Sequence, residues 1–275
     1  MNGIIVLNWN TTDLLIGMYN SARSNSQNPF HFVIIDNGSR EEEVDKLFGY
    51  FKKLHNEQVG EKHNNSNFVK DLYEYKNKDF IVTIKKLPKN VGFAAGNNVG
   101  LKLLDSKITN VIFINSDILI EEKFWDSKFD VLLSGLNVGI IGPAYHPLRW
   151  NKDGRFQIQA KTTEPVESES VQGAFFGIRY SVLDTVIKKD GFVFDENFKF
   201  AHYEETDLCF RIMNLGYKCL WFPCAHQHLH NSSGTKKNGY KLSDEIQCEA
   251  DFKMNSERNR QLLMRKHDTF FKGKS

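Results

Sequence analysis

An acidic cluster formed by Glu204, Glu205 and Asp207 places three carboxyl groups within four positions of the chain. Carboxylates that crowd together raise one another's proton affinity, and a carboxylate of raised affinity suits a general base. The apolar positions that begin at Leu208 have helical spacing, and the dipole of a helix also favours acidic residues at its start. The cluster therefore predicts a base, a helix N-terminus, or both roles divided among its members.

Two further carboxylates come directly after apolar segments. Asp117 is the last residue of Asn115-Ser116-Asp117, which comes after the apolar residues 111–114. Asp36 comes after the apolar residues 32–35. At its strand end, the carboxylate of Asp117 can hold Mg²⁺ or Mn²⁺ together with a diphosphate. The carboxylate of Asp36 can accept the imide N–H of a uracil or thymine ring. The alternative for both is a turn that ends the strand.

Glycines recur every fourth residue at Gly92, Gly96 and Gly100, which brings them near one face of a helix. This spacing differs from that of a dinucleotide or phosphate-binding loop. Such a face permits close approach of a ligand or of another backbone. Asn97 and Asn98 add donors and acceptors suited to the edge of a sugar or a base. Close packing of a helix on a sheet is the alternative.

Three histidines, His226, His228 and His230, alternate along an apparently extended segment and so project to one face. Imidazole nitrogens bind metal ions and contact phosphate. Zinc ligation by all three is a second possibility, and a polar solvent-facing strand is a third.

Composition narrows the class of protein. The chain has 275 residues, 40% hydrophobic and 25% charged, with a formal net charge of +2. These values are typical of a globular protein and argue against disorder and against a general nucleic-acid binder. The four cysteines form no C-x-x-C pair, so we expect neither a disulfide scaffold nor structural zinc, and a cytoplasmic location. No apolar run is long enough to span a membrane.

The chemistry-bearing residues must be positioned by a sheet. In the first half, apolar β-branched runs alternate with helical patterns, which predicts an α/β fold with a mostly parallel sheet covered by helices on both faces. Ligands of such sheets bind beyond the carboxyl ends of the strands, where the polar clusters stand. The five expected strands cover residues 4–7, 32–35, 80–84, 111–114 and 138–141.

The second half is more varied. We expect a strand over 171–180, a helix over 204–215, short strands at 221–222 and 225–230, and an amphipathic helix over 240–267. No linker composition divides the chain. We therefore expect one catalytic domain, 1–235, with a C-terminal helical extension, 236–275.

Taken together and in this order, the motifs resemble inverting family 2 glycosyltransferases of the GT-A fold. The group they resemble most is the rhamnosyltransferase-like enzymes that build bacterial surface polysaccharides. The resemblance covers residues 3 to about 235. It rests on segments 6–10, 35–39, 90–100, 115–117, 173–175, 191–196, 204–211 and 216–218.

The resemblance implies a donor site for a nucleotide sugar. Asp36 would contact the pyrimidine, and Asn115-Ser116-Asp117 stands where the family has D-x-D. Asp117 is thus the expected ligand of Mg²⁺ or Mn²⁺, with a late histidine, His230 in preference to His228. The other residues expected to contact the nucleotide sugar are Asn8, Asn10, Gly92, Asn97, Asn98 and Asn115.

The resemblance also implies an acceptor site. Gly173 and Ala174 would lie beside the acceptor, together with Glu204. The base motif of the family falls on Glu204-Glu205, where Glu205 replaces the usual Asp, and Asp207 is the fallback base.

The implied reaction is transfer of a sugar, with inversion, from a UDP- or dTDP-sugar to a hydroxyl of a glycan or lipid-linked glycan. Seven basic residues in 252–275 could bring a cytoplasmic enzyme to the inner face of the membrane, although a solvated helix packed on the domain is equally compatible. A non-catalytic relative that binds a nucleotide sugar, and a sugar nucleotidyltransferase, are the alternatives. The absence of a Gly-rich, basic loop at residues 8–11 argues against the latter.

Overall fold

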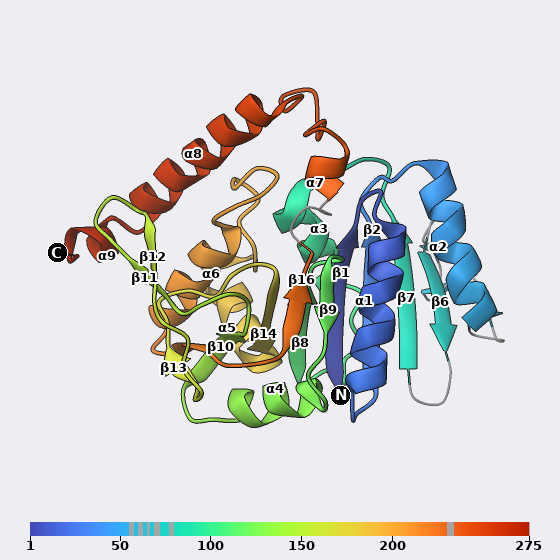
Figure 1. The fold of residues 1–275 in the computed structure, drawn as a ribbon, viewed down its shortest axis with the longest axis horizontal. Coiled ribbons are helices and arrows are strands. Elements are labelled where there is room, and N and C mark those ends of the chain that lie inside the picture. Colours follow the sequence, from blue (N-terminus) through green and yellow to red (C-terminus); the bar gives the residue numbers. More distant parts are fainter. Residues whose placement is uncertain are drawn as a thin grey trace.

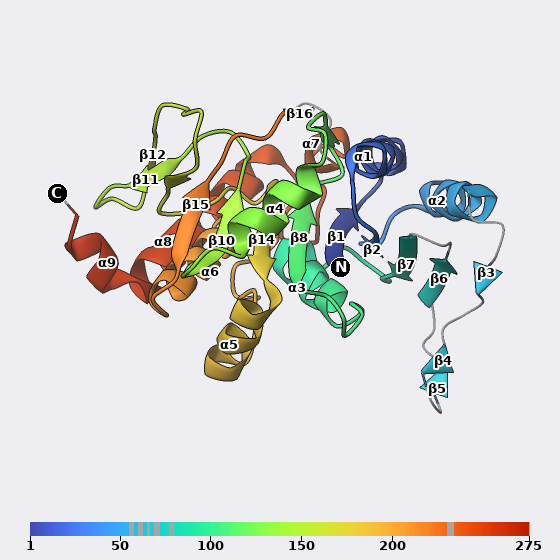
Figure 2. The same ribbon diagram turned by 90° about the horizontal axis from the view of Figure 1, so that it is seen from below.

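The computed structural model describes residues 1–54, 58–59, 63–64, 67–68, 72–76, 80–229 and 234–274. Within them, a ten-stranded sheet runs through the centre of the molecule, with helices on both faces (Figures 1 and 2). From one edge to the other its strands are β13 (Val166–Glu167), β15 (Lys218–Trp221), β10 (Val138–Gly142), β14 (Phe175–Arg179), β8 (Asn110–Ile114), β1 (Asn2–Asn8), β2 (Phe30–Asp36), β7 (Phe80–Lys86), β6 (Leu72–Lys76) and β3 (Gln58–Val59).

The middle of the sheet is parallel. Strands β8, β1, β2 and β7 run side by side in one direction, and all residues of β2 and β8 are buried. Their continuous apolar composition fits strands covered on both faces. The expected mostly parallel sheet is confirmed, with β14 antiparallel between β8 and β10.

Six helices form the outer layers. Helices α1 (Thr12–Asn25), α2 (Glu41–Leu54) and α4 (Trp125–Leu133) cover one face, and their buried side chains join one core. Helices α3 (Gly92–Leu101), α5 (Tyr180–Asp190) and α6 (Glu204–Met213) join the core on the other face. Figure 2 shows α1, α2 and α4 on the side of the sheet opposite α3 and α5.

Helix α3 approaches the sheet closely through its glycines. A Cβ atom on Gly100 would lie 2.6 Å from the Cγ2 atom of Ile5, and one on Gly96 would lie 3.0 Å from the side chain of Leu7. Both partners belong to β1. The glycine spacing at these two positions therefore serves helix–sheet packing, the alternative offered by the sequence.

Smaller strand pairs lie at the ends of the main sheet. The pairing of β9 with β16 joins the segment after Asp117 to the histidine segment. The pairs are β9 (Ile118–Ile120) with β16 (His226–His228), β11 (Leu148–Trp150) with β12 (Phe156–Ile158), and β4 (His63–Asn64) with β5 (Asn67–Phe68).

The C-terminal segment folds back onto the main body. It contains α7 (Gly234–Lys237), α8 (Glu249–Lys266) and α9 (Asp268–Lys272). Leu263 and Phe271 pack with Trp150, Phe198 and Phe210 in a third core. Figure 1 shows α8 crossing above α6. The expected boundary at 235/236 falls within α7 and stays a prediction.

Several expected elements have different limits: the strand expected at 221–222 is β15 (Lys218–Trp221), and two others begin later than expected. The strand expected over 171–180 begins at Phe175, because residues 171–174 leave the sheet. The helix expected over 240–267 begins at Glu249, because Leu242 and Ile246 form a compact turn in which the Leu242 N–H donates to the Ile246 carbonyl over 2.9 Å.

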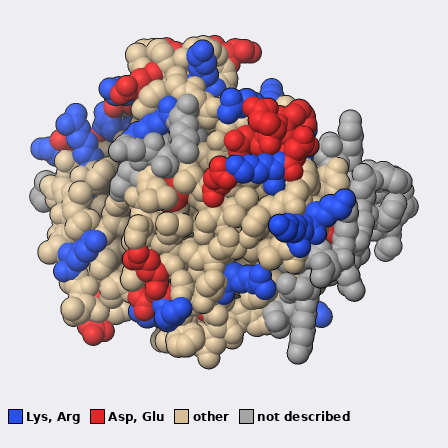
Figure 3. All heavy atoms as spheres, turned by 45° about the vertical axis from the view of Figure 1, so that its right-hand side comes forward, with Lys and Arg blue, Asp and Glu red and all other residues tan. Residues whose placement is uncertain are grey.

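Charges are mixed over the surface. On the face shown in Figure 3, lysines and arginines are dispersed, and acidic residues gather over the beginning of α2, whose first turn holds Glu41, Glu42 and Glu43. Basic residues of the C-terminal segment form ion pairs with the main body or within their helices, so the membrane contact expected there gains no support. These pairs are Lys253–Glu249, Arg260–Glu257, Lys266–Asp195, Lys272–Asp268 and Lys274–Glu169.

None of the helices in the described ranges combines the length and the apolar character that crossing a bilayer requires.

Candidate active site

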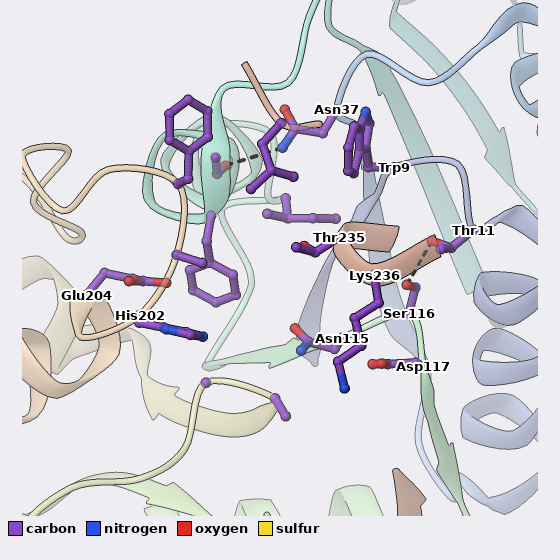
Figure 4. A pocket seen from close by; sticks show the side chains of 18 of the residues that line it. Trp9, Thr11, Asn37, Asn115, Ser116, Asp117, His202, Glu204, Thr235 and Lys236 are labelled. Atoms are coloured by element: carbon purple, nitrogen blue, oxygen red, sulfur yellow. Dashed lines mark hydrogen bonds between the residues drawn. The ribbon is translucent and has the colours of Figure 1, made fainter. Parts of the chain in front are cut away.

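A cavity of about 520 Å³ opens at the carboxyl ends of β1 and β8, the edge of the sheet where ligands were expected. Figure 4 shows three sides of it. Trp9 and Asn37 occupy one side, Asn115 and Asp117 a second, and Glu204 with His202 the third. Segments far apart in the chain therefore converge on one space.

The carboxyl ends of β1 and β2 are joined by a buried polar network. Asn8 and Asp36 are register partners, and the Asn8 amide donates to the Asp36 carboxylate over 3.1 Å. The backbone N–H of Ser39 donates to the same carboxylate, and Asn10 receives the N–H of Arg40. Burial raises the pKa of Asp36, although these hydrogen bonds oppose the rise. Asn8 and Asp36 are fully buried and shape the two turns.

Contact with the pyrimidine therefore stays a prediction for Asp36, and contact with the nucleotide sugar stays one for Asn8 and Asn10. None of the three lines the cavity. Their neighbours Trp9 and Asn37 do line it. The Asn37 amide donates to the Gly92 carbonyl over 3.3 Å and to Asn90 over 3.0 Å. This fixes the side chain at the start of α3 (Figure 4).

The glycine-rich helix contributes its first residues to the cavity. Gly92 lines it with φ +85°, and an added Cβ would lie 2.8 Å from the Cα of Phe200. Asn97 and Asn98 face elsewhere. The Asn97 amide donates to the Phe93 carbonyl, and the Asn98 amide to the Phe194 carbonyl. Their predicted contact with a nucleotide sugar remains untested.

The turn after β8 aims Asp117 into the cavity. The Asn115 N–H donates to the Ala174 carbonyl over 2.8 Å, and the Leu229 N–H donates to the Asp117 carbonyl over 2.9 Å. Ser116 bonds Thr11 through their hydroxyls over 3.0 Å (Figure 4). The turn is thus held from three sides, which fixes the direction of the carboxylate.

His228 stands beside Asp117. Its Nε2 atom lies 3.3 Å from Oδ1 of Asp117, and its Nδ1 atom bonds the Tyr145 hydroxyl. Burial, followed by the charge of Asp117, raises the pKa of Tyr145, so its hydroxyl stays protonated. Gln227 is exposed between the half-buried His226 and His228, as expected for an alternating strand. The His226 ring, however, packs on Phe175 and lies outside the cavity. His230 lies outside the described residues.

The Asp117–His228 pair fits one divalent ion. Two ligands at a right angle, each about 2.1 Å from an ion, lie about 3 Å apart, close to the observed separation. Mg²⁺ and Mn²⁺ that also hold a diphosphate need only one or two protein ligands. No cluster of three metal-binding side chains occurs among the residues that the structure describes.

Lys236 is a cavity residue that the sequence analysis missed. It belongs to α7 and projects into the same space as Asn115 and Asp117 (Figure 4). A positive group there suits an anionic ligand. Trp9, Asn37, Tyr145 and His202 were also missed as site residues. Trp9 and Asn37 could have been found, because each adjoins a polar residue at a strand end.

Glu205 lines the third side from the first turn of α6. Its carboxyl lies against Gly173, where an added Cβ would meet Cδ of Glu205 at 3.4 Å. Burial raises the pKa of Glu205 to about 7, although backbone N–H groups, including that of Gly173, lower it in part. Such a carboxyl changes protonation near neutral pH, as a general base requires.

Glu204 is buried next to it and lines the cavity with Gly173 and Ala174. Its Oε2 atom has no hydrogen-bond partner among the described residues. Burial and the adjacent Glu205 raise the pKa of Glu204 well above the ordinary range. A protonated carboxyl that faces a cavity can exchange hydrogen bonds with a hydroxyl-rich ligand.

Asp207 lies away from the cavity. It is fully buried, with Nε of Arg211 2.8 Å, Nζ of Lys266 2.9 Å and Nε2 of His267 2.9 Å from its carboxylate oxygens. Burial alone would raise the pKa of Asp207, but His267, Arg211 and Lys266 lower it to about 2. Asp207 therefore joins α6 to the C-terminal segment. Of the two bases considered from the sequence, Glu205 is the one that faces the cavity.

The backbone before α6 is unusual. Phe200, His202 and Tyr203 have φ values of 58°, 79° and 77°, and Phe200 and His202 line the cavity. The left-handed region costs a residue with a side chain about 1–2 kcal/mol. The surrounding structure must therefore stabilise this loop.

Solved structures with a similar fold are glycosyltransferases. They include GalNAc-T7 with UDP, GalNAc and Mn²⁺ (TM-score 0.61, 13% identity, 98% of this chain and 56% of that chain covered). A mannosyltransferase from Pyrobaculum calidifontis with GDP-Man and Mn²⁺ has a TM-score of 0.55 at 12% identity, with 81% and 54% covered. S. aureus TarS residues 1–349 have a TM-score of 0.51 at 16% identity, with 81% and 60% covered.

These similarities show that the chain has the GT-A glycosyltransferase fold, as expected from the sequence. The chain spans between about half and three-fifths of the length of these three structures. No protein-family model matches the sequence, and no curated protein matches it.

Proposed function

We propose that this protein is a glycosyltransferase that moves a sugar, with inversion, from a UDP- or dTDP-sugar to a hydroxyl of a glycan or lipid-linked glycan. One observation carries the proposal. Asp117 beside His228, and Glu205 with its raised pKa, line the same cavity at the carboxyl edge of the sheet.

The donor would lie along the sides formed by β1, β2 and β8. The Trp9 ring offers a stacking surface for a base, and Oδ1 of Asn37, which accepts the Val91 N–H, retains a second lone pair for a donor on the edge of the base. Asp117 and His228 would hold Mg²⁺ or Mn²⁺, which when bound supplies positive charge to the diphosphate. Lys236 adds a further positive charge at the same place.

The acceptor would lie on the side formed by α6 and residues 172–174. Glu205, ionised, takes the proton of the acceptor hydroxyl while the oxygen forms a bond to the anomeric carbon. The bond from that carbon to the diphosphate oxygen breaks, and the electron pair leaves with the nucleoside diphosphate. One displacement from the opposite face inverts the anomeric configuration. Glu204 and Gly173 would orient the acceptor.

For the biological role we propose synthesis of a surface polysaccharide in the cytoplasm, by a rhamnosyltransferase-like enzyme of glycosyltransferase family 2. The support is the ordered set of motifs at residues 6–10, 35–39, 115–117 and 204–211. The resemblance to rhamnosyltransferase-like enzymes makes dTDP-rhamnose the first donor to examine.

A thermal-shift screen of UDP, dTDP, GDP and their sugars, with and without Mn²⁺, tests donor binding. We expect UDP or dTDP to raise the melting temperature in Mn²⁺, because a ligand of the native state stabilises it by mass action. Asp117→Asn should abolish the part of the melting-temperature rise that depends on Mn²⁺. Asp45→Asn, on the exposed face of α2, should leave that part unchanged. Absence of any nucleotide effect in Mn²⁺ would contradict the proposal.

A further inference from the structure

Residues 199–203 form the loop that leads from the cavity into α6. The backbone conformation of this loop is unfavourable unless neighbouring groups stabilise it. Phe200, His202 and Tyr203 all have positive φ values. A run of such residues persists only where neighbouring groups fix it. The groups that stabilise this loop come from α8 and α3.

Asn259 of α8 makes the principal contacts. Its side chain is fully buried, and its Nδ2 atom lies 3.0, 3.0 and 3.2 Å from the carbonyl oxygens of Lys199, Ala201 and His202. Three acceptors that converge on one atom require that atom to be a donor, and because the amide nitrogen carries two protons, one proton is shared between two carbonyls. An apolar or acidic side chain of similar size would remove the hydrogen bonds to the Ala201 and His202 carbonyls, whereas the Lys199 carbonyl would keep those from the Ala201 N–H and the Asn255 amide.

The surroundings of the Oδ1 atom also indicate that Asn259 acts through its nitrogen. It is buried and has no hydrogen-bond partner in the described part of the chain. An unpaired acceptor in the interior is unfavourable. What stabilises this amide at its position is therefore the set of bonds made by its nitrogen.

Two further contacts hold the loop from opposite sides. On α8, the hydroxyl of Ser256 bonds Nδ1 of His202 over 2.9 Å. At the start of α3, the Phe93 N–H donates to the Phe200 carbonyl over 2.8 Å. The loop is thus clasped between the first turn of α3 and the buried face of α8, with Asn259 at the centre.

The loop determines where the proposed base stands. It leads directly into Glu204 and Glu205, and the Tyr203 carbonyl accepts the N–H of Asp207, the first backbone bond of α6. A change in the conformation of the loop would reorient the first turn of α6 and, with it, the Glu205 carboxyl.

We infer that Asn259 is a positioning residue that, by binding the carbonyls of Lys199, Ala201 and His202, fixes the loop and so aims Glu205 at the acceptor. The role of Glu205 rests on the proposed function, whereas the control of the loop by Asn259 does not.

The test compares Asn259→Leu and Asn259→Ser with wild type. Leu removes the donors at similar size, and Ser keeps one hydroxyl donor in case the Leu variant does not fold. Hydrogen exchange at residues 199–207 and release of UDP or dTDP from a UDP-hexose or dTDP-rhamnose with Mn²⁺ are measured. We expect exchange at least 10-fold faster in this segment and kcat at least 10-fold lower. Donor KM and nucleotide binding should stay within 2-fold.

Asn255→Leu is the matched control, because Asn255 donates to the Lys199 carbonyl alone, over 2.8 Å. It should change exchange and kcat by less than 3-fold. Exchange at 199–207 that matches wild type in both Asn259 variants would overturn the inference, as would faster exchange with an unchanged kcat. A wild-type protein without turnover would refute the proposed function, and the exchange measurement would still decide the control of the loop.

Discussion

Glu205 and Asp207 are two positions apart, yet they have opposite chemistry. Burial raises the pKa of Glu205 to about 7, whereas His267, Arg211 and Lys266 overcome burial and lower that of Asp207 to about 2. From the sequence both were candidates for the base. Their difference depends on Arg211, four residues after Asp207, and on Lys266 and His267, some 60 residues further along, which local sequence does not reveal.

The raised pKa of Glu205 has a consequence for stability. Below pH 4.5 the carboxyl is protonated in both the folded and unfolded states. Between pH 4.5 and about 7 the unfolded state loses the proton first, so stability falls through this window. Relative to wild type, Glu205→Gln should therefore become progressively more stable from pH 4.5 to 7, by on the order of a few kcal/mol.

Urea unfolding at several pH values measures this difference in free energy. Glu42→Gln, on the exposed surface of α2, controls for the removal of a carboxyl group. If the free energies of unfolding of Glu205→Gln and wild type differ by the same amount at pH 4.5 and at pH 8, the carboxyl of Glu205 does not lie in a strongly desolvating environment.

At the scale of elements, the strands were predictable and some connections were not. A strand buried on both faces carries a continuous apolar run, which is why β2 and β8 could be located from residues 32–35 and 111–114, although His31 and Asp36 of β2 are polar and buried. Leu242 and Ile246 have helical spacing but form a turn, whose Ser243 hydroxyl accepts the N–H of Ile246. Serine competes with helical hydrogen bonds in this way. The capping box of Cys248 and Asp251 marks the true start of α8.

Helix α3 gives a prediction at this scale. Gly100→Ala should destabilise the protein by about 1–3 kcal/mol, because the added methyl group would meet Ile5 at 2.6 Å and push α3 from β1. Gly49→Ala in α2 is the matched control. Nothing lies within 4 Å of its added Cβ, so it should stabilise by about 0.5–1 kcal/mol. Chemical denaturation measures both, and equal effects of the two substitutions would contradict the packing assigned to α3.

At the scale of the molecule, the C-terminal segment is part of the site. Lys236 and Phe252 line the cavity, and His267 binds Asp207. The sequence analysis located most motifs of the cavity, because parallel strands bring their carboxyl ends to one edge. It treated residues 236–275 as an appendage because contacts with distant residues leave no local pattern. These contacts join the helices from α7 to α9 to the main body.

The central claim is that Glu205 acts as a base on a donor held at Asp117. It is tested most directly by the pH dependence of nucleoside diphosphate release from a UDP-hexose or dTDP-rhamnose in Mn²⁺. For wild type, kcat/KM should rise with pH and level off above about pH 7, as Glu205 becomes ionised. Glu205→Gln should lower the rate by about 10²–10⁴-fold and remove the rising limb, with nucleotide binding unchanged. A Glu205→Gln protein that keeps the rate and pH profile of wild type would contradict the account.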